Sequence, residues 1–340
     1  MPAKNPKILS VSIACYNLGA LIEQNLQSFL GDPKVYDQLE LLVVDDGSTD
    51  HDTVARVQKY VKKYPQSVRL IQQPNAGPGA TVNTGLKHAT GKYFRMVDGD
   101  DWVNPHALAH LVEKLKNTDA DMVITNYETF HDKRGESVNL FKPSQLKDSQ
   151  LTSFDDFNYD YNPPIRMHNT IWKTELLKRN RIKLDNGFYT DLEYLLFPTA
   201  FVKTLIYFDL NLYVYRIAHG DQSTSPAKLI QNRPKHKAIM LALIQNYRQN
   251  VNIMSAGQKS YLIRQIAGAL VTHVDVLLLI GGKNLTSNLK DFFKEIKQDY
   301  PEFYSDFLID KKTRLLLKSR FLLAHPFSIY LKNKYKLINR

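Results

Sequence analysis

Short apolar runs alternate with amphipathic stretches along the first 130 residues. The runs of strand length lie at 8–15, 39–44, 68–72, 93–97 and 122–127. Between them, apolar residues recur every three or four positions, as on one face of a helix; examples are 80–88 and 105–115. Strands that alternate with helices form right-handed βαβ units. The pattern therefore predicts an α/β fold with a mostly parallel sheet flanked by helices.

Polar side chains gather directly after these predicted strands. They are Tyr16, Asp46, Asn75, Asp98, Asp100 and Asp101. In an open α/β sheet, ligands bind beyond the carboxyl ends of the strands. We therefore expect these side chains to contribute to one site.

The acidic cluster after 93–97 carries the strongest chemical signal. Asp98, Asp100 and Asp101 place three carboxylates within four residues, which is costly unless a cation lies among them. Oxygen ligands with no Cys or His beside them suit Mg²⁺ or Mn²⁺. An ion held by few carboxylates usually has a phosphate as its other partner. For the cluster taken alone, an acidic turn before a helix remains the alternative.

After residue 130, the pattern of polar and apolar residues changes at two places along the chain. Residues 131–165 are polar and rich in turn formers, so we expect an excursion over the site. A strand is predicted again at 204–215. From about 228 onward, long helical patterns predominate, so we expect an α/β domain at 1–225 and a helical, basic region at 226–340. The most apolar stretch, 266–282, carries His273 and Asp275 and is too short for a membrane span, which favours a buried helix.

Amino-acid composition indicates the class of protein, its compartment and the charge of its partners. Hydrophobic residues make up 43% and charged residues 23%, as in ordinary globular proteins. The single cysteine, Cys15, excludes an internal disulfide and favours a reducing compartment. The first residues lack the apolar core of a signal peptide, so the expected location is cytoplasmic. The net charge of +11 favours anionic partners.

Much of that positive charge lies at the C-terminus. Residues 311–340 contain nine Lys or Arg and no acidic residue, interleaved with apolar side chains. Such a segment suits peripheral binding to an anionic membrane surface at the inner face of the cell membrane. A helix packed on the rest of the protein with a solvated basic face is the alternative. No nucleic-acid motif accompanies the charge, so we expect no nucleic-acid partner.

Several motifs together resemble the family 2 glycosyltransferases with the GT-A fold, a Rossmann-like architecture. The matching segments are SIACYN (12–17), LLVVDDGSTD (41–50), NAGPGATVNTGLKHATGKY (75–93) and MVDGDDWVNP (96–105), with weaker matches at 171–195 and 212–223. The resemblance covers about two thirds of the chain. It implies an inverting transfer from a UDP-sugar or dTDP-sugar to an acceptor hydroxyl, with Mn²⁺ or Mg²⁺. The implied acceptor is a glycan or is lipid-linked or protein-linked, as in polysaccharide or glycoconjugate assembly.

The resemblance also implies roles for residues around the nucleotide. Tyr16 would lie against the base, and Asp46 would accept the imide proton of uracil. Asn75 and Gly77, in the matched loop, are further nucleotide-sugar-binding candidates. Val82 stands where the family often has Arg. The diphosphate contact of that Arg would have to come from another residue, for which Lys173 and Arg216 are the candidates.

Further implied roles concern the metal and the reaction. Asp98 would contact the ribose or the metal, and Asp100 would ligate the metal. His219 is a candidate for an extra metal ligand. Asp191 matches the carboxylate that takes the proton of the acceptor hydroxyl, although Thr190 stands where the family usually has Glu.

Two other function classes fit parts of the pattern. A metal-dependent nucleotidyltransferase or phosphohydrolase could use the same acidic cluster, but it would be expected to show a Gly-rich phosphate loop, and no GxxxxGK[ST] motif is present. A non-catalytic, basic membrane-associated module would keep the fold and tolerate loss of Asp191. Turnover of a nucleotide-sugar by the purified protein separates these alternatives.

Overall fold

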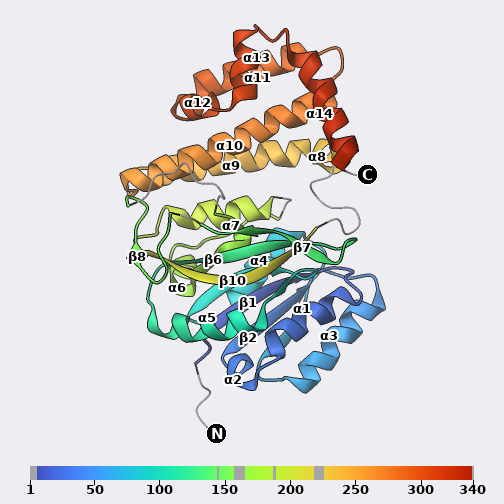
Figure 1. The fold of residues 1–340 in the computed structure, drawn as a ribbon, viewed down its shortest axis with the longest axis vertical. Helices are drawn as coiled ribbons and strands as arrows, with labels where there is room; N and C mark the ends of the chain where they lie inside the picture. The colour runs from blue at the N-terminus through green and yellow to red at the C-terminus, as the bar shows by residue number, and fades with distance from the viewer. Residues whose placement is uncertain (1–5, 144, 157–164, 187–188, 218–225, 339–340) are drawn as a thin grey trace. The chain divides into compact units, whose positions relative to one another are not determined.

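The chain folds as two compact units, Met1–Gly220 and Asp221–Arg340. The computed structural model describes residues 6–143, 145–156, 165–186, 189–217 and 226–338 (Figure 1). The division lies close to the change of sequence pattern near residue 225.

The first unit is built on one ten-stranded sheet (Figure 1). Its strands are β1 (Leu9–Cys15), β2 (Leu39–Asp45), β3 (Val68–Gln72), β4 (Tyr93–Asp98), β5 (Trp102–Val103), β6 (Met122–His131), β7 (Glu136–Phe141), β8 (Leu151–Thr152), β9 (Thr170–Lys173) and β10 (Leu205–Ile217). The order across the sheet is β3-β2-β1-β4-β9-β6-β10-β5, with β7 beside β6 and β8 beside β10.

Helices flank this sheet. They are α1 (Leu21–Leu30), α2 (Pro33–Tyr36), α3 (His51–Lys63), α4 (Pro78–His88), α5 (Pro105–Asn117), α6 (Thr174–Arg179) and α7 (Thr190–Thr199), with a 3-10 turn, η1, at Met167–Asn169. Helix α4 packs against β1 and β2, and α5 packs against β10. The apolar runs of β1 and β2 are fully buried, with no exposed surface at Val11, Ile13 or Leu41. Burial on both faces explains why these strands read as continuous apolar runs.

The first four strands bring their carboxyl ends to one edge of the sheet. Strands β2, β1 and β4 are parallel, and the register pairs Cys15 with Asp45 and Ala14 with Asp98. The residues that follow these strands therefore meet at the same edge. This edge is where the sequence predicts the site.

The second half of the sheet mixes strand directions. Strand β9 runs antiparallel to both of its neighbours, β4 and β6. The segment at 131–165, expected to be a polar excursion over the site, contributes β7 and β8 within its described part. Strand β7 pairs antiparallel with β6. Its residues are mostly exposed, so the alternation that marks a half-buried strand is weak there.

The second unit consists of helices among its described residues. They are α8 (Pro226–Gln231), α9 (Arg233–Asn250), α10 (Ala256–Ile280), α11 (Leu285–Asp299), α12 (Pro301–Phe307), α13 (Lys311–Lys318) and α14 (Ala324–Ile338). Helix α10 is long and apolar enough to cross a membrane by length and composition alone. Core helices of soluble proteins pass the same test, and α10 buries Leu270, Val274 and Leu278 against its neighbours. Its burial within the unit matches the expectation of a buried helix around 266–282.

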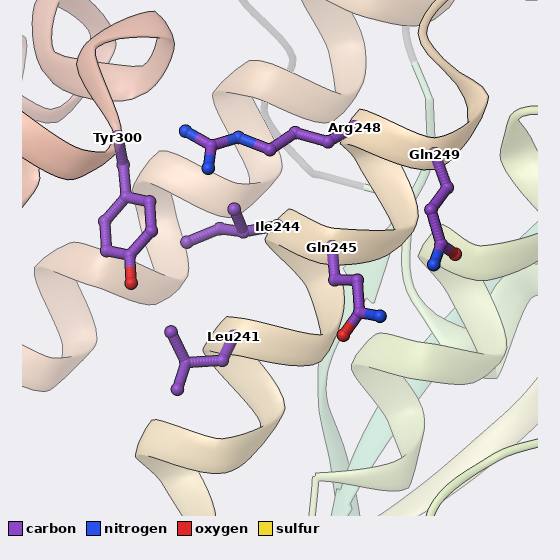
Figure 2. A pocket seen from close by; sticks show the side chains of 6 residues that line it. All are labelled: Leu241, Ile244, Gln245, Arg248, Gln249 and Tyr300. Atoms are coloured by element: carbon purple, nitrogen blue, oxygen red, sulfur yellow. The ribbon is translucent and has the colours of Figure 1, made fainter.

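A pocket of about 360 Å³ opens beside α9 (Figure 2). Its lining residues are Leu241, Ile244, Gln245, Arg248, Gln249 and Tyr300. The Arg248 guanidinium lies over the Tyr300 ring and forms an ion pair with Glu302. These contacts give Arg248 a structural role within the helical unit.

The basic C-terminal segment is partly packed and partly exposed. Leu316, Phe321 and Ala324 are buried. In contrast, Leu322 is 82% exposed and Ile329 is 63% exposed. The segment thus supplies core residues to the unit and also presents apolar side chains to solvent, so a membrane role for it stays a prediction.

Candidate active site

The loop between β4 and β5, residues 98–101, is held in place by buried contacts; it is called the acidic loop below. Asp101 is buried, and its carboxylate accepts hydrogen bonds from the Tyr213 hydroxyl at 2.5 Å and from the backbone N–H of Arg216 at 2.7 Å. The Asn25 side-chain amide donates to the carbonyls of Asp98 at 3.2 Å and Asp101 at 2.8 Å. Asp101 therefore braces the loop.

Arg216 also fixes the acidic loop. Its Nε donates to the carbonyl of Asp100 at 2.8 Å, and its guanidinium lies 4.7 Å from the centre of the Trp102 ring. The same guanidinium forms an ion pair with Asp132 and a hydrogen bond with Gln24. A diphosphate contact by Arg216 stays a prediction, and the contacts seen assign it a role in holding the loop.

The electrostatics of the acidic loop favour a cation. Burial, followed by the charges of Asp100 and Asp191, raises the pKa of Asp98 to about 7. Burial and the charges of Asp98 and Asp100 hold the pKa of Asp101 well above its usual value. A divalent ion among these groups would relieve the repulsion and keep Asp98 ionised at neutral pH.

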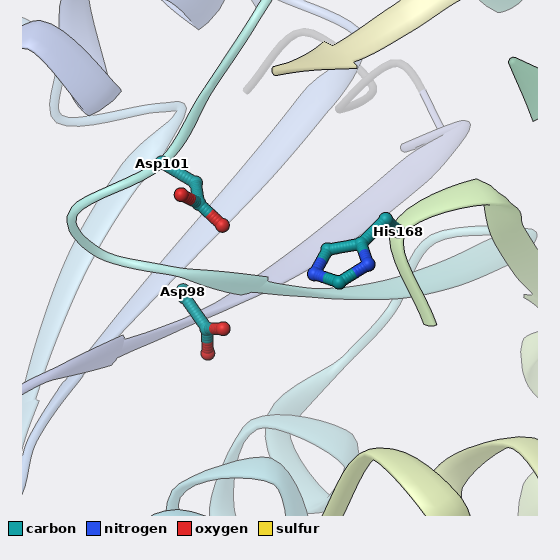
Figure 3. A group of neighbouring side chains, drawn as sticks. All are labelled: Asp98, Asp101 and His168. Carbon is teal, nitrogen blue, oxygen red and sulfur yellow. The ribbon is translucent and has the colours of Figure 1, made fainter. Parts of the chain in front are cut away.

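One histidine joins the carboxylates. Asp98, Asp101 and His168 each place a possible ligand atom within 4.8 Å of the others (Figure 3). The His168 ring stacks on Tyr215 at 4.4 Å, and its buried Nδ1 has no hydrogen-bond partner within the described part of the chain. Burial lowers the pKa of His168 to about 3, so the imidazole is neutral, which is the form that ligates metals.

This donor set fits a divalent ion. Asp98, Asp101 and His168 are the described residues whose possible ligand atoms lie close enough together to hold it. Metal ligation by Asp100 stays a prediction. His219, the histidine named from the sequence, lies outside the described residues. His168 was missed because it falls at the end of a turn-rich segment, with no periodic pattern around it.

Around the predicted nucleotide site, Tyr16 and Asp46 differ in their surroundings. Tyr16 follows β1 and is 47% exposed, which leaves a ring face for a base. Asp46 is buried, and its carboxylate accepts from the backbone N–H groups of Ala76 at 3.0 Å and Gly77 at 2.8 Å. Asp46 therefore also shapes the loop that carries the exposed Asn75. Base recognition by these residues stays a prediction.

The segment that leads to Asp191 rests on the same loop. A Cβ added at Gly77 would lie 2.0 Å from the carbonyl oxygen of Asn186, and one at Gly79 would lie 1.6 Å from that of Asp185. Only glycine allows this close approach of two backbones. Farther along α4, Asn83 exchanges hydrogen bonds with the backbone of Leu184 at 2.8 and 2.9 Å.

Asp191 lies in the first turn of α7 and close to the acidic loop. Its charge contributes to the raised pKa of Asp98. Part of the side chain reaches solvent, yet desolvation by the surrounding protein raises the pKa of its own carboxyl. A raised pKa suits a carboxylate that must accept a proton near neutral pH.

Substitution of Gly79 by Ala tests this backbone contact. The new methyl group would overlap the Asp185 carbonyl, so we expect Gly79→Ala to lower the free energy of unfolding by ~1–3 kcal/mol and to lower transfer activity. Gly268→Ala is the control, because nothing lies within 4 Å of its added Cβ and alanine favours a helix. Equal urea-unfolding midpoints for the two variants would contradict the contact.

Lys173 is not brought to the site. It ends β9 and pairs with Tyr93, at the start of β4, while Asp98 ends that strand. At ~3.3 Å per residue, the two positions lie ~16 Å apart along β4. The Lys173 ammonium donates to Asp119 at 2.8 Å. The lysine therefore lies at the opposite edge of the sheet from the acidic loop.

Arg166 is a cation that sequence reasoning missed. Its side chain is exposed. Its charge opposes the raised pKa of Asp191 and adds to the effect of burial in lowering the pKa of His168. It precedes η1, whose His168 joins the acidic loop. Arg166 thus places a positive charge near Asp191 and His168.

Comparisons with known proteins agree with this architecture. The crystal structure of Staphylococcus aureus TarS 1–349 in complex with UDP matches with a TM-score of 0.59 at 17% identity, over 97% of this chain and 91% of that one. A mannosyltransferase from Pyrobaculum calidifontis, in complex with GDP-Man and Mn²⁺, matches with a TM-score of 0.50 at 18% identity, over 100% and 89%. These likenesses confirm the GT-A fold predicted from the sequence.

Sequence relatives point to the same family. Glycosyltransferase GlyA of Streptococcus pneumoniae serotype 4 is 26% identical over 239 residues, which are 63% of this chain and 31% of the relative. The chain thus spans about a third of that protein's length. The family model described as "Glycosyl transferase family 2" matches residues 10–179, half of the chain. The chain therefore belongs to glycosyl transferase family 2.

Proposed function

We propose that the protein is an inverting, metal-dependent glycosyltransferase. It moves a sugar from a UDP-sugar or dTDP-sugar to the hydroxyl of a glycan, lipid-linked or protein-linked acceptor, in polysaccharide or glycoconjugate assembly. The observation that carries the proposal is the closeness of Asp191 to the acidic loop: after burial and the charge of Asp100, the charge of Asp191 also raises the pKa of Asp98. Membership of family 2 supports the same reaction class.

Each residue of the proposed site has a separate role in a single displacement reaction. Asp191 accepts the proton of the acceptor hydroxyl as that oxygen attacks the anomeric carbon. Asp98, Asp100 and His168 would hold the divalent ion, which would supply positive charge to stabilise the departing nucleoside diphosphate. Arg166 adds a second positive charge beside the phosphates. One displacement with one base inverts the anomeric configuration.

A neighbouring carboxylate fits a structural role rather than that of a nucleophile. Glu193 is fully buried, and its Oε2 accepts from the backbone N–H of Asp185 at 2.7 Å. A retaining enzyme would need a second carboxylate exposed at the sugar. Glu193 instead braces the segment that precedes Asp191, so it is not placed to act as such a nucleophile.

The nucleotide specificity can be tested by thermal unfolding. We expect UDP with Mn²⁺ to raise the melting temperature more than ADP or GDP does at the same concentration, because Asp46 and Tyr16 suit a pyrimidine with an imide N–H. A ligand that binds only the folded state stabilises it more when its affinity is higher. Equal shifts for all three nucleotides would count against base recognition by Asp46.

We also propose that the protein binds the inner face of the cell membrane from the cytoplasm. The exposed Leu322, Ile329 and Tyr330 lie in a segment rich in Lys and Arg, which suits an anionic surface. Serine at these three positions is expected to weaken binding to vesicles with anionic lipids, and salt is expected to weaken wild-type binding.

A matched variant controls for lost apolar surface. Leu140, Leu151 and Ile253 are also exposed, and serine at these positions should leave vesicle binding unchanged. Co-sedimentation measures both variants. Equal binding by the C-terminal variant and the wild type would place any anchor outside this segment.

A further inference from the structure

A second pocket, of about 380 Å³, lies on the first unit between α4 and the segment that follows α6. Its lining residues are Asn83, Leu86, Lys87, Leu177, Lys178, Arg181, Ile182 and Lys183. Four of these eight residues are cationic and none is acidic. A volume of this size falls within the ~300–1,000 Å³ range of small-ligand sites.

The cations at this pocket are available to a ligand. Lys87, Lys178, Arg181 and Lys183 are exposed, and none of them forms an ion pair with a carboxylate among residues that the structure describes. Lys178 donates to the carbonyl of Ala89 at 2.7 Å, which fixes one wall. Positive charges that converge without a protein counter-ion attract anions.

The floor of the pocket is apolar. Leu86 and Leu177 are buried, and Ile182 is partly buried beside them. A rim of cations above an apolar floor suits a ligand that combines anionic groups with C–H surface, as a charged sugar or polyol does. Free inorganic ions would use only the rim.

Arg181 follows the end of α6 and has a backbone conformation that glycine usually adopts. Its φ of 51° is left-handed, and the N–H of Ile182 donates to the Leu177 carbonyl at 3.0 Å, which closes the end of α6. Glycine adopts this conformation without a steric cost, and arginine does not. The arginine puts a guanidinium at the pocket where the local backbone gives no reason for one.

The pocket is joined to the segment that carries Asp191. Asn83 lines the pocket and holds Leu184 by reciprocal hydrogen bonds. The next residue, Asp185, packs on Gly79 and donates its N–H to Glu193 in α7. A ligand in the pocket would therefore contact the same run of chain that leads to the proposed base.

We propose that this pocket is an acceptor subsite for an anionic glycan or polyol polymer, one whose repeating units carry phosphate or carboxylate groups. This inference rests on the proposed transferase function and names the class of its acceptor. A charged unit distant from the reacting hydroxyl occupies the pocket, while the growing end reaches Asp191. Because the anionic groups repeat along the polymer, each successive unit can occupy the pocket in turn.

The test is binding by the full chain at fixed ionic strength. Short-chain polyphosphate is the phosphate probe, oligogalacturonate the carboxylate probe and maltohexaose the neutral one. We expect Lys87→Gln/Arg181→Gln/Lys183→Gln to weaken binding of at least one anionic probe at least tenfold, and maltohexaose to bind neither protein tightly. Lys178 is left intact because it supports the carbonyl of Ala89.

The matched control removes equal charge from another helix. Lys59, Lys62 and Lys63 are exposed on α3, and the last two lie in its final turn, as Lys87 does in α4. Their replacement by Gln should change binding less than twofold. Equal losses in both triple variants would overturn the subsite, as would equally tight, pocket-dependent binding of a DNA oligonucleotide or of anionic vesicles.

A second readout separates this inference from the proposed function. The rise in melting temperature with UDP and Mn²⁺ should be the same in the pocket variant and the wild type. A normal UDP response without pocket-dependent polyanion binding overturns the acceptor subsite alone. Absence of any response to UDP in the wild type contradicts the proposed function.

Discussion

Asp191→Asn is expected to lower the rate of sugar transfer about 10²–10⁴-fold and to leave the melting temperature and UDP affinity close to wild type. The amide keeps the size of the carboxylate but cannot accept the proton of the acceptor hydroxyl. Transfer rate and UDP affinity should be measured in the same preparation. The proposed assignment rests on the closeness of Asp191 to the acidic loop.

A helix cap is the competing role for Asp191, since its carboxylate accepts from backbone N–H groups at the start of α7. Loss of a cap costs about 0.5–2 kcal/mol of stability and does not abolish turnover. The pH profile separates the two roles. Desolvation raises the pKa of Asp191, so wild-type transfer should fall as the pH drops through that raised value, because the base becomes protonated.

Asp191→Asn should lack this acid limb. Transfer within a few-fold of wild type would make Asp191 a cap. The base would then have to be sought among Asp155, Asp156 and Glu193, or at Asp160, which lies outside the described residues. Of these, Glu193 is fully buried, whereas Asp155 and Asp156 are exposed.

Asp100→Asn and metal removal are expected to have the second large effect. Burial and, after it, the charge of Asp100 raise the pKa of Asp98, so a cation should be required for ordered binding of the diphosphate. We expect the variant to lose most activity while keeping its fold, and excess chelator to do the same to the wild type. Added Mn²⁺ or Mg²⁺ should restore the chelated wild type.

The control for Asp100→Asn is Asp119→Asn. Asp119 is an exposed carboxylate that pairs with Lys173 at the opposite edge of the sheet, so this change removes the same charge and should keep activity. Release of UDP from a UDP-sugar measures all four conditions. Full activity in excess chelator would exclude a metal-dependent mechanism.

Parallel strands explain why sequence reasoning located the site. The apolar runs of β1, β2 and β4 were visible because these strands are buried on both faces. The observed bounds of each strand differ from the predicted ones by one residue at one end. Parallel neighbours end at one edge, so Tyr16, Asp46 and Asp98 could be grouped without coordinates.

Residues that follow an antiparallel strand cannot be grouped in this way. Strand β9 reverses direction between β4 and β6, which carries Lys173 away from the acidic loop while His168, before the strand, reaches it. The direction of one short strand depends on long-range pairing and leaves no local pattern. Arg166 and His168 were therefore invisible to a reading of spacing and composition.

The central claim, inverting transfer from a UDP-sugar, is tested most directly by the anomeric configuration of the product. With Mn²⁺, an α-linked UDP-sugar and water as the acceptor, proton NMR identifies the sugar anomer that is released before mutarotation equilibrates the two forms. A single displacement on the side of Asp191 predicts the β anomer first. Initial release of the α anomer would contradict the proposed mechanism.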